Sequence, residues 1–292
     1  MKGSAVPIGI FDGVHRGHQL VLQRAVSAAR ERDLRVVVIT FDPHPVAILR
    51  PESMPLMLTT LPRRVELLEA NGADEVVVLE FSDAMSQQTP EEFIEQTLLG
   101  RLAAKRIVVG QNFRFGHRAK GDVALLRKYD LQVDDVPLLA DVETISSTYI
   151  REQIALGDVA AAAVALGRPH FVEGPVVRGD ARGRVLGFPT ANVAVDHRIA
   201  IPQDGVYAGH VRRASGSRSI AAISVGTNPT FDGVHRRVEA YIIDEGHDLE
   251  LYDEHLVIEF DERLRGMEKF ASVEDLVEQM AKDVVATRAR LH

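Results

Sequence analysis

Four short segments in the first half of the chain are apolar along their whole length, and this feature most restricts the fold. Segments with the helical spacing of apolar residues separate them. A strand without a polar face is typical of a sheet that is buried on both sides, and alternation with helices is typical of parallel strands. We therefore predict an α/β unit with a parallel sheet. The strands are expected at VPIGIF (6–11), LRVVVITF (34–41), EVVVLEF (75–81) and RIVVG (106–110), and the helices at 18–32, 61–72 and 89–102.

The pattern changes after about Gly167, where short strands punctuated by Gly, Asp, Asn and Pro follow one another without intervening helices. This spacing predicts an antiparallel barrel or sandwich. A final helix is expected at 273–291, and an Ala-rich helix within 157–169 joins the halves. We thus expect two domains, 1–167 and 168–292. The strands of the second are expected at 171–177, 191–195, 206–213, 219–226, 238–244 and 255–260.

The composition excludes several classes of protein. A formal net charge of −8 argues against nucleic-acid and membrane binding, which need a basic surface. Without cysteine, disulfides, thiolate nucleophiles and Cys-ligated zinc are excluded. No apolar run approaches the roughly 20 residues of a membrane span, and no signal-peptide pattern is visible. We expect a cytoplasmic protein; self-association is compatible with the sequence, which carries no signal for it.

The hexapeptide FDGVHR occurs twice, at 11–16 and at 231–236. A duplicated domain would repeat its order of strands and helices, and the two halves differ in that order. The first copy continues with Gly17 and His18 at a strand-to-helix junction, whereas the second continues toward another strand. There Asp232 and Gly233 form a turn signal between antiparallel strands. We interpret the repeat as one site and one coincidence.

The junction after the first strand has the features of a phosphate site. Backbone N–H groups at a helix start are unpaired and attract anions. Gly13 and Gly17 allow a sharp turn and a close approach to a ligand. His15 and His18 lie three residues apart, so that their rings can converge on one face and stabilise charge on a reacting triphosphate. Helix capping, core packing and metal ligation are the alternatives for an HxxH pair; the flanking strand and glycines favour phosphate binding.

Two further segments carry ligand-binding features. In ISSTYIR (145–151) three hydroxyls precede a helix, where they can cap it or donate to phosphates, and Arg151 can add a charge-assisted hydrogen bond. In QNFRFGHRAKGD (111–122) glycines, two phenylalanines, Asn112 and several cations are combined, which is unusual for an ordinary surface loop. The segment TFDPHP (40–45) could equally be a strand end followed by a turn.

Taken in this order, these motifs resemble the FMN adenylyltransferase module of bacterial bifunctional riboflavin kinase/FAD synthetases, with the HxGH signature of Rossmann-like nucleotidyltransferases. The resemblance implies catalytic roles for His15 and His18. It implies flavin contacts by Phe41, Asp42, Phe113 and Phe115. It implies ATP contacts by Gly9, Phe11, Gly13, His15, Gly17, His18, Asn112, Ser147, Thr148 and Arg151.

The stretch GPVVRGDARGRVLGFPTANV (174–193) is the most distinctive of the second half. Its Gly-rich basic loop suits polyphosphate, although flexible surface loops look the same. Thr190 and Asn192 are two apart on a predicted strand and share a face. Their oxygens are hard ligands suited to Mg²⁺, so we expect both to bind metal and ATP phosphates. Without the adjacent loop, a Thr–Asn pair at a strand end would be the commoner interpretation.

This stretch resembles the riboflavin kinase module of the same family. The resemblance implies ATP contacts by Gly179, Arg182, Gly183, Arg184, Thr190 and Asn192. It implies that Glu239 is the general base on the riboflavin 5′-hydroxyl; on residues alone, Glu239 could simply face solvent. It also implies that Arg265 supports the flavin end of the pocket, and the alternative is a solvated charge. The family typically has LYG where this chain has LYD, ending at Asp253, and usually has more residues before the first strand.

The resemblance covers nearly the whole chain and implies two reactions. The C-terminal barrel, with its C-terminal helix, would convert riboflavin and ATP to FMN and ADP. The N-terminal module would convert FMN and ATP to FAD and pyrophosphate, and both would use Mg²⁺. Three alternatives stay open at this point: one working module beside a scaffold, a non-catalytic flavin-binding protein, and a transferase for another nucleotide.

Overall fold

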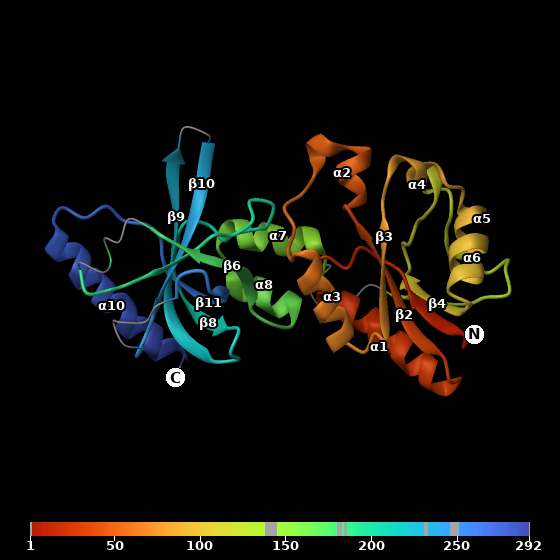
Figure 1. Cartoon of the computed structure of the whole chain (residues 1–292), viewed down its shortest axis with the longest axis horizontal. Coiled ribbons are helices and arrows are strands. Elements are labelled where there is room, and N and C mark those ends of the chain that lie inside the picture. Colours follow the sequence, from red (N-terminus) through yellow and green to blue (C-terminus); the bar gives the residue numbers. More distant parts are fainter. Residues whose placement is uncertain are drawn as a thin grey trace. The chain divides into compact units, whose positions relative to one another are not determined.

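The computed structural model describes residues 2–137, 145–179, 183, 186–230, 233–245 and 251–291 (Figure 1). The chain forms two compact units, Met1–Ser147 and Thr148–His292, which are described separately. Within the described residues, no helix is both long enough and apolar enough to cross a membrane.

The first unit is built on a five-stranded parallel sheet in the order β3-β2-β1-β4-β5, which confirms the predicted sheet. The expected strand at 6–11 was misplaced, because Phe11 has a φ of 54° and cannot continue an extended strand. The edge strand β5 was not predicted, since two aspartates interrupt its apolar pattern. The strands are β1 (Ser4–Pro7), β2 (Arg35–Asp42), β3 (Glu75–Glu80), β4 (Ala104–Gly110) and β5 (Gln132–Val136).

Helices cover both faces of this sheet (Figure 1). Val37 and Ile39 of β2 pack into one hydrophobic cluster with the helical residues Phe93 and Leu98. Val36 and Val38 pack into the other cluster. Successive side chains of a strand point to opposite faces, so a strand buried on both faces must be apolar throughout. The helical segments are α1 (Arg16–Glu31), α2 (Pro45–Leu49), η1 (Pro51–Ser53), α3 (Leu61–Ala70), α4 (Asp83–Gln87), α5 (Pro90–Glu92), the π-helical η2 (Phe93–Arg101), η3 (His117–Ala119) and α6 (Val123–Leu126).

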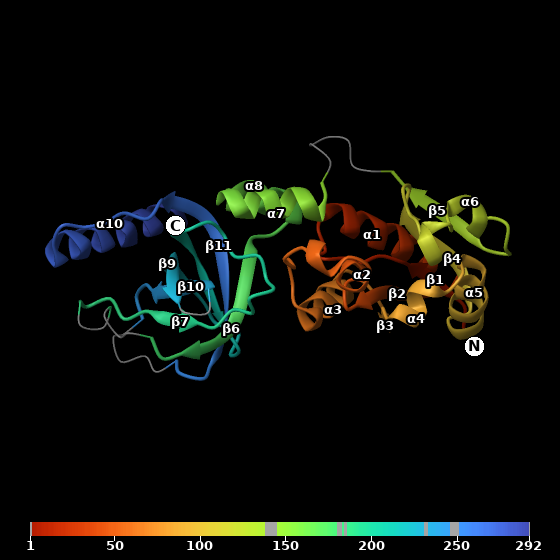
Figure 2. The ribbon, with the colours of Figure 1, turned by 90° about the horizontal axis from the view of Figure 1, so that it is seen from above.

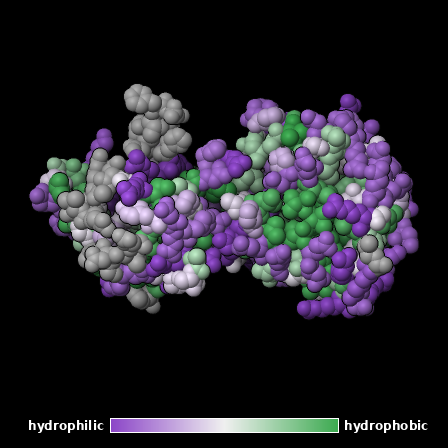
Figure 3. Space-filling model, viewed as in Figure 1, coloured by the Kyte–Doolittle hydropathy of each residue, from purple (hydrophilic) through white to green (hydrophobic). Residues whose placement is uncertain are grey.

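The first unit has a capped helix start at Thr89 and an exposed group of hydrophobic residues around β3. The predicted cap at Thr89 is present as a capping box with Glu92. On the face of this unit seen in Figure 3, hydrophobic residues gather around the edge strand β3, where Val78 is 37% exposed.

The second unit is a closed six-stranded barrel in the order β10-β7-β6-β11-β8-β9, preceded by α7 (Ser147–Leu156) and α8 (Val159–Leu166). The predicted barrel and Ala-rich helix are confirmed, and α8 ends at Gly167, whose φ is 73°. The helix α10 (Val273–Leu291) contacts β8, β9 and β11 (Figure 2). The strands are β6 (His170–Val177), β7 (Ala191–Val193), β8 (Gly205–Arg213), β9 (Arg218–Thr230), β10 (Gly233–Ile242) and β11 (His255–Arg265).

In the second hexapeptide copy, residues 233–236 belong to β10, which pairs antiparallel with β9 from Gly233 opposite Thr230 onward. Residues 231 and 232 of the predicted turn lie outside the described residues. The interpretation of this copy as a link between strands, rather than a second strand-to-helix site, agrees with that pairing.

Gly209 of β8 is required by close packing within the barrel. A Cβ atom at this position would lie 2.0 Å from the backbone oxygen of Glu259 and 2.5 Å from Cδ1 of Ile223. We expect Gly209→Ala to lower the free energy of unfolding of the barrel by about 2–3 kcal/mol, because the backbone of β11 must move. Urea unfolding followed by circular dichroism measures this. Gly226→Ala is the matched control, since its Cβ would lie 3.7 Å from Met267 Cε; equal midpoints for the two variants would contradict the packing argument.

Candidate active sites

The N-terminus of α1 brings His15 and His18 together. His15 is the N-cap residue, and its Nδ1 accepts a hydrogen bond from the backbone N–H of His18 at 3.4 Å. The two rings are stacked, with centroids 3.6 Å apart. A Cβ atom on Gly17 would lie 3.1 Å from Cε1 of His15, so a glycine leaves room for this stack. The expected convergence is therefore present, and the capping role raised as an alternative is present with it.

The side chain of His18 is partly buried, and its Nδ1 atom is shielded from solvent. Its Nδ1 has no hydrogen-bond partner among the described residues, and the edge of Phe11 packs at 5.1 Å between centroids. Burial, and then the neighbouring His15, lower the pKa of His18 well below its usual 6.5. The imidazole is thus neutral at physiological pH, and a polyanionic ligand would favour its protonated form.

The turn before α1 is held by buried contacts. Gly13 has a φ of 79°, in the left-handed region that glycine adopts readily. The Oγ of Ser147 donates to the backbone oxygen of Asp12 at 3.0 Å. Thr148 and Arg151 follow in α7, exposed and half-buried respectively. A Cβ on Gly9 would meet the ring of Phe11 at 3.2 Å.

The remaining residues predicted for this site lie at the end of β2 and in the segment after β4. Phe41, Phe113 and Phe115 pack against the same hydrophobic cluster, and the rings of Phe113 and Phe115 are stacked at 5.4 Å. Asp42 ends β2 with its side chain 48% exposed, and Asn112 is exposed in the loop after β4. Since all strands are parallel, these segments leave the same edge of the sheet as the turn before α1.

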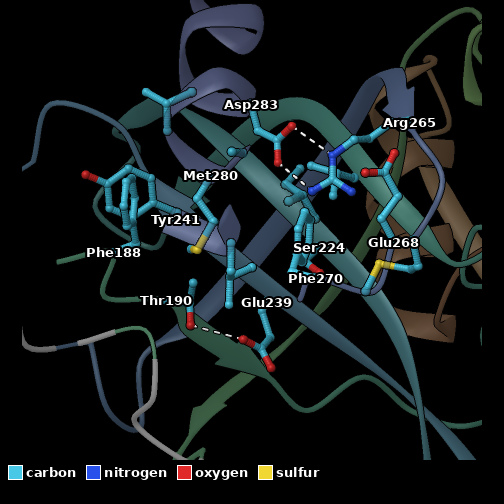
Figure 4. A pocket seen from close by; sticks show the side chains of 16 residues that line it. Phe188, Thr190, Ser224, Glu239, Tyr241, Arg265, Glu268, Phe270, Met280 and Asp283 are labelled. Carbon is cyan, nitrogen blue, oxygen red and sulfur yellow. Dashed lines mark hydrogen bonds and ion pairs between the residues drawn. The ribbon is translucent and has the colours of Figure 1, made fainter. Parts of the chain in front are cut away.

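In the second unit, strand register assembles a polar cluster on the outside of the barrel. Glu239 of β10 lies opposite Asn192 of β7 and Ser224 of β9, so the three side chains share a face. The Oγ of Thr190 donates to Oε2 of Glu239 at 3.1 Å (Figure 4). Glu239 therefore does not simply face solvent.

Two glycines of the predicted phosphate loop are required by close contacts with this cluster. A Cβ on Gly179 would lie 2.5 Å from Nδ2 of Asn192, and one on Gly183 would lie 2.4 Å from the backbone oxygen of Phe188. Arg182 and Arg184 lie outside the described residues. Gly179 thus packs directly against the predicted metal ligand Asn192, and a Cβ on Gly183 would lie 3.5 Å from Oγ1 of Thr190.

A cavity of about 360 Å³ opens beside Glu239 (Figure 4). Its polar lining comprises Thr190, Ser224 and Glu239 together with the charged residues Arg265, Glu268 and Asp283. Its volume suits a ring system of drug-like size. The apolar walls come from the barrel, the segment after β11 and α10, and include Val206, Tyr241, Met267, Phe270, Met280 and Val284.

Arg265 lines this cavity as an ion-paired residue. Its Nε and Nη2 donate to the two carboxylate oxygens of Asp283 at 2.9 and 2.8 Å, and its guanidinium lies over Phe270. The hydrogen bonds to Asp283 raise the pKa of Arg265. Its predicted alternative as a solvated charge is wrong. Sequence reasoning missed Asp283, although an acidic residue in the same helical stripe as Leu276 and Met280 was a usable signal.

The turn at Asp253, where the resembled family typically has glycine, keeps the glycine conformation. Asp253 has a φ of 65°, and its N–H donates to the backbone oxygen of Val176 at 3.0 Å. Aspartate tolerates the left-handed region better than most residues, so this substitution is accommodated without changing the backbone type of the turn.

Comparison with known proteins gives consistent results over the whole chain. The family model for FAD synthetase matches residues 1–149, and that for riboflavin kinase matches residues 166–291. The bifunctional riboflavin kinase/FMN adenylyltransferase of Escherichia coli K12 is 34% identical, covering 98% of this chain and 92% of that protein. Its counterpart in Listeria monocytogenes is 36% identical, covering 97% and 90%. A crystal structure described as a macrolide-efflux protein from Streptococcus pneumoniae has a TM-score of 0.91 and 36% identity, covering 99% and 95%.

The two units are thus group-transferring enzymes joined in one chain. The chain belongs to the family of bifunctional riboflavin kinase/FMN adenylyltransferases. It phosphorylates riboflavin to FMN and adenylylates FMN to FAD, with ATP as co-substrate of both reactions.

The lowered pKa of His18 predicts that the stability of the protein depends on pH. Because folding lowers its pKa, the unfolded chain binds the proton more readily below about pH 6.5. The contribution of the neutral His18 to the free energy of unfolding is therefore complete above about pH 6.5 and is lost as the pH falls below that value. We expect His18→Gln to lose less free energy of unfolding than the wild type between about pH 7.5 and about pH 5.5. Urea unfolding at both values measures it, and an equal loss in both proteins would contradict the assignment.

Proposed function

We propose that the two activities use separate sites, with kinase chemistry at Glu239 and adenylyl transfer at the N-terminus of α1. The observation that carries the first assignment is the Thr190–Glu239 hydrogen bond at the edge of an apolar cavity of about 360 Å³. The apolar walls suit the isoalloxazine ring of riboflavin, and the polar groups around Glu239 suit the 5′-end of its ribityl chain. The boundary between the modules lies after Gly167, since the 145–151 motif serves the first site; both substrates and ATP favour a cytoplasmic location.

In the kinase, Glu239 accepts the proton of the riboflavin 5′-hydroxyl while its oxygen attacks the γ-phosphorus of ATP, and ADP leaves. The hydrogen bond from Thr190 orients the carboxylate. Gly179 and Gly183, with Arg182 and Arg184, hold the phosphates. Arg265 shapes the flavin end of the cavity through its contact with Phe270.

The residues around Glu239 fit a magnesium ion. The Thr190 hydroxyl and the Asn192 amide oxygen are hard donors next to a carboxylate, the ligand type that Mg²⁺ prefers alongside water and nucleotide phosphate. No group of three or more His, Asp and Glu residues suited to a metal occurs in the part of the chain that the structure describes. Thr190 and Asn192 would therefore hold the ion, which when bound offsets phosphate charge.

In the transferase, a phosphate oxygen of FMN attacks the α-phosphorus of ATP and pyrophosphate leaves, without a covalent enzyme intermediate. His15 and His18, together with backbone N–H groups at the start of α1, stabilise the charge of the reacting phosphates. Ser147, Thr148, Arg151 and Asn112 bind ATP. Phe41, Asp42, Phe113 and Phe115 place the flavin; the shared apolar cluster beneath the three phenylalanines supports this role.

Two substitutions separate the activities. Glu239→Gln removes the proton acceptor and should lower riboflavin phosphorylation at least about 100-fold, while supplied FMN is still converted to FAD. His18→Ala should lower FAD formation at least about 100-fold and leave FMN formation intact. Chromatography of flavins after incubation with riboflavin, ATP and Mg²⁺ measures both. Wild-type FAD formation by His18→Ala, or normal phosphorylation by Glu239→Gln, would overturn the corresponding site.

The metal assignment is tested by Thr190→Val, which removes the hydroxyl with little change of volume. We expect the Mg²⁺ concentration for half-maximal kinase activity to rise about tenfold or more. Thr190→Ser, which keeps the hydroxyl, is the matched control and should remain close to the wild type. An unchanged Mg²⁺ requirement in Thr190→Val would exclude Thr190 as a ligand.

A further inference from the structure

Arg64 of α3 is a fully buried cation to which neither reaction gives a role. It is 1% exposed and is among the largest fully buried side chains of the described residues. Its Nη1 donates to the backbone oxygen of Ile10 at 2.9 Å and lies 3.4 Å from the backbone oxygen of Phe41. Its Nη2 lies 3.7 Å from Oδ1 of Asp42. One guanidinium therefore contacts the segment after β1 and the end of β2.

Further hydrogen bonds join the same two segments. The Oγ of Thr40 donates to the backbone oxygen of Ile10 at 2.9 Å, and Nη1 of Arg64 lies 3.5 Å from that hydroxyl. Ile10 directly precedes residues 11–14, the turn that leads to His15 and His18 and is called the HxGH turn below, and Thr40 directly precedes Phe41 and Asp42. The contact lies immediately behind the two segments that we assign to ATP and to the flavin.

The residues just before α3 hold the HxGH turn from another side. The buried carboxylate of Asp12 accepts hydrogen bonds from the backbone N–H groups of Leu58 and Thr59 at 3.0 and 3.2 Å. The N–H of Gly13 donates to Oγ1 of Thr59 at 3.3 Å. Through residues 58–64, one short stretch of chain fixes both the start of the turn and the end of β2.

Burial of this cation is unfavourable. Desolvation lowers the pKa of Arg64, while Asp12 and Asp42 oppose that shift. Its Nε has no hydrogen-bond partner among the described residues, and Asp42 is half exposed. An apolar side chain would fill the same space without this cost. Arginine provides what an apolar residue cannot, namely several donors in a fixed plane aimed at carbonyl oxygens of two segments.

We propose that Arg64 is a positioning residue of the adenylyltransferase, which sets the distance and angle between the HxGH turn and the Phe41–Asp42 segment. This inference rests on the proposed function of those two segments. Each segment binds its own substrate, and the guanidinium fixes one relative to the other, so that the FMN phosphate meets the α-phosphorus of ATP in line. Misplacement by about 1 Å is enough to lower such a reaction by about 100-fold.

The test compares Arg64→Lys with Arg63→Lys in the full-length protein. Lysine keeps the charge but has a single donor centre, which cannot serve Ile10 and Phe41 in the same plane. For Arg64→Lys we expect kcat of FAD formation to fall about 100-fold, while KM for ATP and for FMN changes less than about threefold. Riboflavin phosphorylation by the same chain is the internal control and should stay at the wild-type rate.

Arg63 is the matched control because it is the same residue type on the same helix, paired with Glu66 at 2.6 Å near the surface. Arg63→Lys should leave FAD formation at the wild-type rate. Wild-type kcat in Arg64→Lys overturns the proposal. A rise in both KM values with unchanged kcat also overturns it, because that pattern shows damaged binding rather than misalignment.

A second variant decides the case if Arg64→Lys fails to fold. Thr40→Val removes the hydroxyl between Ile10 and the guanidinium and keeps the volume. It should lower kcat of FAD formation about tenfold with unchanged KM values, and an unchanged kcat overturns the proposal. The His18→Ala result separates the two levels of inference. If that variant retains FAD formation, the site itself is misassigned; if it loses FAD formation while Arg64→Lys and Thr40→Val retain kcat, only the role of Arg64 fails.

Discussion

The hydrogen bonding of β1 to β2 on one side and to β4 on the other determines where the first active site lies. After β1 the chain forms β2 on one side of β1, and it later forms β4 on the other side. The segments that follow β1, β2 and β4 therefore all start at the same edge of the sheet, next to one another. Ligand sites of open parallel sheets form at such a point. For this reason the HxGH turn, the Phe41–Asp42 segment and the loop of Asn112 lie at the same edge. Arg64 connects the first two segments through the backbone oxygens of Ile10 and Phe41.

In the barrel, the register of the antiparallel strands determines which side chains lie next to Glu239. Glu239 lies directly opposite Asn192 and Ser224 because of the antiparallel pairing of β10 with β7 and β9, and a shift by one residue would turn Glu239 into the barrel interior. The close contacts of Gly209 restrict how β8, β9 and β11 pack together. The ion pair between Arg265 and Asp283 ties α10 to the end of β11, so the cavity beside Glu239 keeps its outer wall. The position of the Glu239 carboxylate thus depends on residues throughout the barrel, many of them far from Glu239 in the sequence.

The sequence predicted those features that follow from local pattern. Apolar strands indicated the two-sided sheet, Thr89 indicated a helix start, and the spacing of His15 and His18 indicated converging rings. Edge strand β5 was missed because Asp134 and Asp135 give it no apolar pattern, although Asp134 forms an ion pair with Arg106. Arg64 directly follows Arg63, and only tertiary structure makes Arg64 fully buried and leaves Arg63 partly exposed. The bonding of Thr190 to Glu239 joins residues 49 positions apart, which no local pattern encodes.

The neutral state of His18 has a consequence for which molecules the first site retains. A permanent cation at the start of α1 would attract chloride and inorganic phosphate, which are abundant and would compete with the nucleotide. An imidazole held uncharged by burial gives such ions little additional attraction. A ligand that brings several negative charges at once can stabilise the protonated ring and so acquires the stronger hydrogen bond. On the proposed assignment of this site to ATP, the uncharged ring therefore adds no charge attraction for small anions beyond that of the helix N-terminus itself.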